Sequence, residues 1–104
     1  MPIYRAPVED YRFLLHEVLE LEKHRDLPGF ADLDAGLVDD ILGNAGKFCE
    51  EVLQPLNQSG DEEGCKLNRD THDVTAPAGF KDAYAKYVEG GWAALSAEEE
   101  YGGQ

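Results

Sequence analysis

The amino-acid sequence predicts a mostly α-helical fold, a small domain of three to four helices with one long polar loop and a short hairpin. Apolar residues recur every three or four positions in several segments, which is the period of an amphipathic helix. Pro–Gly and Gly–Gly pairs, which favour turns, separate these segments. Between Leu56 and Pro77 the sequence is polar, rich in Gly, Asn and Asp, and without a helical period, which predicts a loop.

The first predicted helix runs from about Val8 to Lys23. Glu9 and Asp10 lie in its first turn, where the positive end of the helix dipole favours anions. One stripe with helical spacing joins Tyr11, Leu14, Leu15, Val18, Leu19 and Glu22. A turn at Pro28-Gly29 follows.

The second predicted helix begins at Asp34, a residue type that caps helix N-termini well. Its apolar stripe is formed by Leu37, Val38, Ile41, Leu42, Ala45, Phe48 and Val52. Gly43 and Gly46 weaken this helix, and a close approach of another segment would explain them. Pro55 is expected to end the regular part, because proline lacks a backbone N–H.

The carboxyl-terminal half is expected to contain a hairpin and two further helices. The hairpin would turn across Asn68-Arg69-Asp70. A third helix begins near Pro77, is stopped by Gly90-Gly91, and carries on one side Phe80, Tyr84, Tyr87 and Val88. Ser96 and Glu99 form a Ser-x-x-Glu capping pattern that predicts a fourth, short helix, ended by Gly102-Gly103.

The length, charge and composition of the chain limit the functions that are compatible with it. The chain has 104 residues and a formal net charge of −13, from nine Lys and Arg against 22 Asp and Glu. This charge disfavours nucleic acid and anionic membrane surfaces as partners. It leaves two alternatives, an acidic surface that only aids solubility or a partner with a positive patch. No apolar run approaches the ~20 residues of a membrane span.

The two cysteines and the amino terminus predict a cytoplasmic protein. Cys49 and Cys65 lie too far apart for a Cys-x-x-Cys motif, and no secretory signal precedes them. Lone cysteines in such a chain are expected to be reduced thiols.

The sequence contains no complete catalytic, cofactor-binding or metal-binding constellation. His16 and Glu20 share a helix face but lack the further ligands that zinc requires. The acidic stretch from Asp61 does not follow the EF-hand pattern, and no glycine-rich phosphate loop follows a predicted strand. Trp92 either stacks on a flat ligand or fills the gap between two helices.

Five short motifs, in order and at compatible spacing, resemble the amino-terminal part of the acyl-CoA dehydrogenases. They are Pro55-Leu56-Asn57, Gly60-Asp61, Gly79-Phe80-Lys81, Gly90-Gly91-Trp92 and Tyr101-Gly102-Gly103-Gln104. The opening "YRAPVEDYRFLLHEVLEL" resembles an extra segment found in the branch similar to 3-methylmercaptopropionyl-CoA dehydrogenase. The resemblance implies an amino-terminal extension with one helix over residues 1–30. Over residues 31–104 it implies the helical amino-terminal domain, truncated before a middle β domain.

The resemblance also implies an activity for the full-length protein. Members of the family desaturate an acyl-CoA thioester between Cα and Cβ. A glutamate removes the α-proton, FAD accepts the hydride, and electrons pass to an electron-transfer flavoprotein. The catalytic glutamate and most FAD contacts belong to the domains missing here, so this chain alone is expected to be inactive and not to bind FAD.

On this interpretation the partners are the remaining domains of the same enzyme, and the enzyme is a homo-oligomer. The candidates for packing against those domains are Phe80, Tyr84, Tyr87, Trp92 and Tyr101. Each is equally a candidate for the internal core. Missing partners would leave apolar surface exposed, so the isolated chain is expected to self-associate.

Two other hypotheses remain open. In the first, the chain is a free-standing acidic helical module that binds other proteins. In the second, it belongs to a relative that keeps the dehydrogenase scaffold and has lost the chemistry. The reading frame discriminates the first of these: a stop codon directly after Gln104 favours the module.

Overall fold

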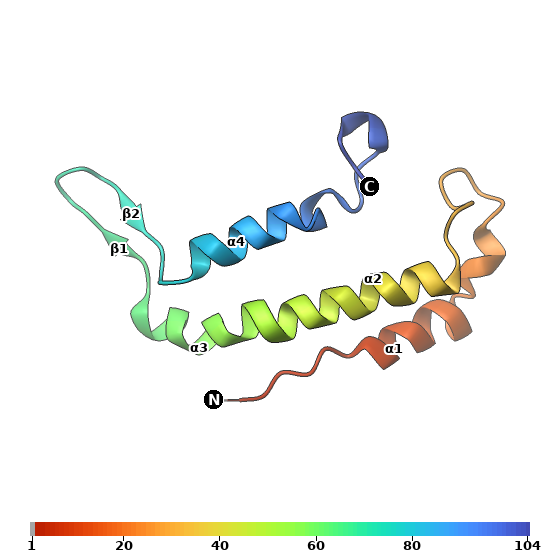
Figure 1. The fold of residues 1–104 in the computed structure, drawn as a ribbon, viewed down its shortest axis with the longest axis horizontal. Coiled ribbons are helices and arrows are strands. Elements are labelled where there is room, and N and C mark those ends of the chain that lie inside the picture. The colour runs from red at the N-terminus through yellow and green to blue at the C-terminus, as the bar shows by residue number, and fades with distance from the viewer. Residues whose placement is uncertain (1) are drawn as a thin grey trace. The chain divides into compact units, whose positions relative to one another are not determined.

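The computed structural model describes residues 2–104, and these fall into two compact units. The first, unit 1, ends at Gln54, and the second, unit 2, spans Pro55–Gln104. Most of the chain is helical, with one two-stranded sheet (Figure 1). The predicted fold class, a small helical fold with a short hairpin, is therefore confirmed.

The first predicted helix begins at Val8 as expected but does not continue to Lys23. The α-helical part, α1, spans only Val8–Arg12 and passes into a π-helical turn at Phe13–Val18. Glu20 then adopts a left-handed conformation with φ 48°, and a 3₁₀ turn follows at Leu21–His24. Most of the predicted stripe stays about half exposed, so little burial energy holds the later turns in a regular helix.

Helix α2 spans Ala35–Phe48 and begins as predicted, because Asp34 accepts a hydrogen bond of 2.7 Å from the backbone N–H of Leu37. Val38 and Gly46 are buried on this helix. A Cβ added at Gly46 would lie 3.0 Å from Val8 and 3.1 Å from Ala6. The expected close approach is therefore found at Gly46, whereas Gly43 faces open space.

The prediction that Pro55 ends the helix is wrong. A π-helical turn at Cys49–Leu53 follows α2 directly, and helix α3 then spans Gln54–Glu63. Because the wider turn restarts the hydrogen-bonding pattern, Pro55 falls in the first turn of α3, where a missing N–H costs little. The first part of the predicted polar loop is consequently helical.

The hairpin is confirmed. Strands β1 (Lys66–Leu67) and β2 (Val74–Thr75) pair antiparallel, with Lys66 opposite Thr75 and Leu67 opposite Val74. The Asn68 side-chain oxygen accepts from the backbone N–H groups of Asp70 and Thr71, which organises the turn.

Helix α4 spans Phe80–Glu89 and ends at Gly90 as predicted. The predicted helix at Ser96 is wrong, because only two 3₁₀ turns, Trp92–Ala94 and Glu99–Tyr101, follow α4. The backbone N–H groups of Tyr101 and Gly103 both bond to the Glu98 carbonyl, and the Gln104 N–H bonds to that of Ala94. These bonds close a compact loop in place of a helix.

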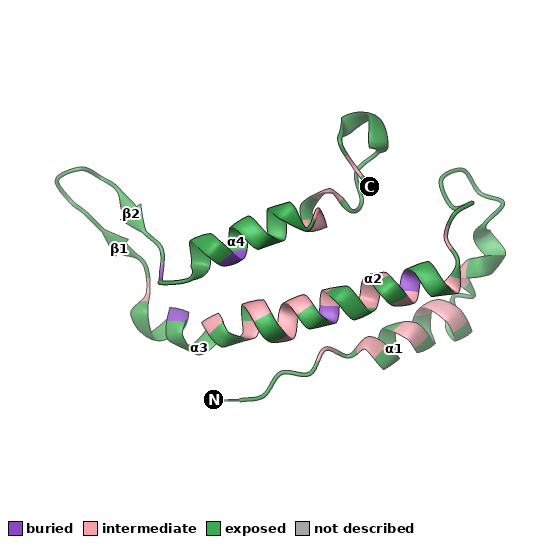
Figure 2. Cartoon of the chain, viewed as in Figure 1, coloured by how far each residue is buried: buried purple, intermediate pink, exposed green. Residues whose placement is uncertain are grey.

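Neither unit encloses a sizeable core. The buried residues are few and small: Val38 and Ala83, with Gly46, Gly60 and Pro77, among those that the structure describes (Figure 2). The accessible surface is 8210 Å². Two separate compact bodies of half this mass would expose about 7000 Å² together. Each unit therefore leaves apolar surface to solvent that a finished domain would bury.

Candidate functional site

The five predicted packing residues all lie in unit 2. Phe80, Tyr84 and Tyr87 belong to α4, and Trp92 and Tyr101 belong to the 3₁₀ turns that follow. Tyr84 is 67% exposed and Tyr101 is 79% exposed, whereas Phe80 is 39% exposed and Trp92 is half-buried. Their role in packing against further domains remains a prediction.

The glycines of the sequence motifs mark where α3 meets the segment around α4. A Cβ added at Gly60 would lie 2.5 Å from two carbons of the Phe80 ring, so the ring packs directly on the helix backbone. A Cβ at Gly79 would lie 2.7 Å from a methyl of Leu56. Three of the five motifs thus contact one another inside unit 2, which sequence reasoning did not predict. The motif glycines were the signal that could have revealed it.

The other two motifs meet at the carboxyl-terminal end of α4. Gly91 has φ 75°, and a Cβ added there would overlap the side chain of Gln104. At Gly90 an added Cβ would lie 2.7 Å from Nε1 of Trp92, so the indole covers this glycine. All five motifs therefore build the internal framework of unit 2.

Helix α4 carries two apolar rows: an inner face that contains Phe80, which packs on Gly60 of α3, and a second row beside it. Phe80, Ala83 and Tyr87 are three and four residues apart and share the inner face, where Ala83 is buried. Tyr84 and Val88, four residues apart, form the adjacent row and are 67% and 52% exposed. The rings of Tyr84 and Tyr87 lie 6.3 Å apart at 31°. The exposed row is the main apolar surface of α4.

Unit 1 contains a polar cluster that joins α1 and its π-helical turn to α2. Asp39 accepts a hydrogen bond of 2.7 Å at Oδ1 from Nε2 of His16. Oδ2 of Asp39 lies 3.1 Å from Nη2 of Arg12, and Nη1 of the same guanidinium donates to Oε1 of Glu9 at 3.0 Å. The hydrogen bond from His16, followed by that from Arg12, lowers the pKa of Asp39 below 3.8, although partial burial opposes the shift. The same carboxylates raise the pKa of Arg12.

This lowered pKa predicts an acid-sensitive attachment of α1. Asp39 stabilises the folded form above its ordinary pKa of 3.8, and that contribution is lost as the pH falls through its lower folded value. We expect Asp39→Asn to weaken unit 1 at neutral pH and to flatten its loss of helicity below about pH 4. Circular dichroism across this range measures the effect, with Asp40→Asn as the exposed control on the same helix. Identical acid curves for Asp39→Asn and the unsubstituted protein would contradict the assignment.

The start of α2 does not suit the pyrophosphate of FAD. A helix N-terminus binds phosphate through unoccupied backbone N–H groups and a positive field. At the start of α2, carboxylates of Glu22 and Asp34 already accept from Ala35 and Leu37. Within residues 2–104, no group of three His, Cys, Asp or Glu side chains is placed to hold a metal ion.

Curated acyl-CoA dehydrogenases resemble the chain along most of its length. It is 33% identical over 100 residues to 3-methylmercaptopropionyl-CoA dehydrogenase of Ruegeria pomeroyi, which covers 96% of the chain. It is 30% identical over 103 residues to the broad-specificity linear acyl-CoA dehydrogenase FadE5 of Mycobacterium tuberculosis, which covers 99%. The predicted resemblance to the acyl-CoA dehydrogenases is confirmed.

A third relative, butyryl-CoA dehydrogenase of Syntrophomonas wolfei, is 34% identical over 95 residues, or 85% of the chain. The chain spans only 15–17% of the length of these acyl-CoA dehydrogenases. No protein-family model matches it. None of the helices in the part of the chain that the structure describes is both long and apolar enough to cross a membrane.

Proposed function

We propose that the chain is the amino-terminal helical part of an FAD-dependent acyl-CoA dehydrogenase that desaturates an acyl-CoA thioester. One observation carries the proposal: three such enzymes match 85–99% of the chain, and the chain spans about one-sixth of their length. As the family resemblance implies, the cofactor and the catalytic glutamate would belong to the remaining domains. This chain alone is then inactive.

The proposed role of the helices is to cover one side of the acyl pocket. Excluding water from a reaction site strengthens the electrostatic interactions inside it. Few hydrophobic residues are buried in either unit, which supports the proposal that polypeptide of the remaining domains covers the exposed apolar side chains. Phe80, Tyr84, Tyr87, Trp92 and Tyr101 are the residues proposed to face or support that contact.

The proposal also covers the oligomeric state, the electron acceptor and the location of the full-length enzyme. A homo-oligomer that transfers electrons to an electron-transfer flavoprotein is the arrangement implied by the family. Cys49 and Cys65 are free thiols, in keeping with a proposed cytoplasmic location.

The test is to express the full reading frame and measure flavin absorbance before and after adding acyl-CoA under anaerobic conditions. A yellow protein that bleaches with acyl-CoA is expected. A yellow protein that does not bleach supports the scaffold without chemistry, and a frame that stops after Gln104 supports the acidic interaction module. A colourless protein overturns the proposal.

A further inference from the structure

We infer that the exposed row of α4, Tyr84 and Val88, is the surface on which the polypeptide following Gln104 docks in the full-length enzyme. This inference rests on the proposed function and deepens it, because it separates docking residues from internal ones. Tyr84 and Val88 are 67% and 52% exposed in unit 2. We call this pair the docking row.

Internal contacts of unit 2 hold two of the other aromatic side chains near α4. Phe80 packs on Gly60, and the indole of Trp92 covers Gly90. Ala83, on the same face as Phe80, is buried. Tyr84 and Val88 continue the apolar surface beyond this face. Although the Tyr84 ring lies 6.3 Å from that of Tyr87, both Tyr84 and Val88 remain more than half exposed. Tyrosine suits an interface, since its ring buries apolar area while its hydroxyl can bond to a partner.

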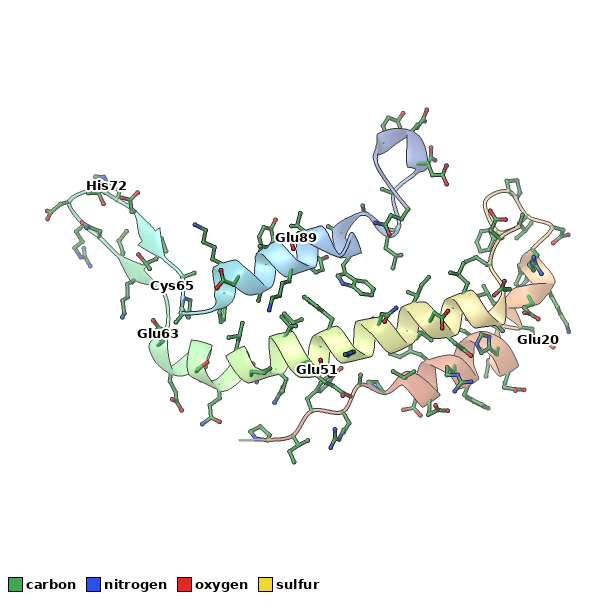
Figure 3. The ribbon with its side chains drawn as sticks, in the orientation of Figure 1. Glu20, Glu51, Glu63, Cys65, His72 and Glu89 are labelled. Carbon is green, nitrogen blue, oxygen red and sulfur yellow. The ribbon has the colours of Figure 1, made fainter. Side chains whose placement is uncertain are left out.

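The opposite side of the helix provides a contrast. Asp82, Lys86 and Glu89 are exposed and charged, as expected for a face that stays in water. Glu89, at the carboxyl-terminal end of α4, is labelled in Figure 3. The apolar character is therefore confined to one flank of α4 and does not surround it.

The path of the chain identifies the occupant. The N–H of Gln104 bonds to the carbonyl of Ala94 at 3.1 Å, and its side chain packs at Gly91. Polypeptide continuing from Gln104 therefore starts beside the carboxyl-terminal end of α4. A short tether of this kind raises the local concentration of the following segment at the docking row. The relatives, about six times as long as this chain, provide ample polypeptide to cover it.

Cysteine labelling tests the inference directly. In the full-length protein carrying Cys49→Ala and Cys65→Ser, the variants Tyr84→Cys, Val88→Cys and Glu89→Cys are each treated with a maleimide. We expect both positions of the docking row to react at least about tenfold more slowly than Glu89→Cys, because reaction there requires the docked segment to open. At a dilution at which residues 1–104 are monomeric by sedimentation, the same three variants of this shorter chain should react at similar, fast rates.

Each other outcome overturns the inference. Fast labelling of the docking row in the full-length protein shows that the row is uncovered. Slow labelling in residues 1–104 shows that the cover lies within this chain, or in a second copy if the protection rises with concentration. Flavin bleaching by acyl-CoA, measured on the same samples, reports the proposed function separately. An active flavoprotein with an unprotected docking row would reject only the docking.

Discussion

Replacing Gly79 by alanine is expected to lower the free energy of unfolding of unit 2 by about 2–3 kcal/mol. Gly79 precedes α4 with φ 85°, in the left-handed region, where a Cβ costs roughly 1–2 kcal/mol. That Cβ would also lie 2.7 Å from a methyl of Leu56. Since this methyl is the far end of a flexible side chain, it can move, and the contact adds about 1 kcal/mol.

Gly102→Ala is the matched control for this substitution. Gly102 has almost the same backbone conformation, φ 86°, but an added Cβ would have no neighbour within 4 Å. The loss in free energy of unfolding caused by Gly102→Ala therefore measures the cost of the left-handed backbone conformation alone. Urea unfolding followed by the fluorescence of Trp92, the single tryptophan, reports on unit 2. Equal losses for the two variants would show that the Leu56 contact is energetically neutral, and no loss for either would contradict the left-handed assignment.

Local signals in the sequence were sufficient for the elements that depend on nearby residues. The Asp34 cap, the hairpin turn at Asn68 and the stop of α4 at Gly90 each require only a few neighbouring residues to form. Such features follow from side-chain hydrogen bonds and glycine geometry, which the sequence displays directly.

The helices could not be predicted correctly where their period changes. The π-helical turns at Phe13–Val18 and Cys49–Leu53 alter the spacing that identifies an apolar stripe. One of them lets a helix continue through Pro55, and the other is followed by the left-handed Glu20. After Ser96, backbone hydrogen bonds close a loop at Gln104, and the predicted capped helix does not form. The last of these bonds joins Gln104 to Ala94, which lies outside the four-residue capping pattern.

The candidate functional site, too, could be predicted only in part from the sequence. The aromatic residues of α4 were identified from their spacing, but their different exposures depend on which of them meets α3. Phe80 is held by Gly60, twenty positions earlier, while Tyr84 on the next row is left exposed. A helical pattern places both on the same broad side and cannot separate internal packing from a docking surface.

Alanine substitutions at two helical glycines are expected to act in opposite directions. Gly43→Ala should stabilise α2 by about 0.5–1 kcal/mol, since alanine is the better helix former and the space around Gly43 is open. Gly60→Ala gains the same propensity in α3, but its Cβ would lie 2.5 Å from the Phe80 ring. Displacing a packed ring costs about 1–3 kcal/mol, so the net effect is a loss of about 1–2 kcal/mol.

A double-mutant cycle attributes the Gly60 effect to its cause. If the ring of Phe80 is the obstacle, Phe80→Leu should make Gly60→Ala less harmful, because the smaller side chain leaves room for the added methyl. Trp92 fluorescence in urea measures the Gly60 and Phe80 variants, and circular dichroism follows Gly43→Ala in unit 1. A stabilising Gly60→Ala would mean that the ring does not rest on α3. The inner face of α4 would then be available for docking too, and the distinction between Phe80 and the docking row would fail.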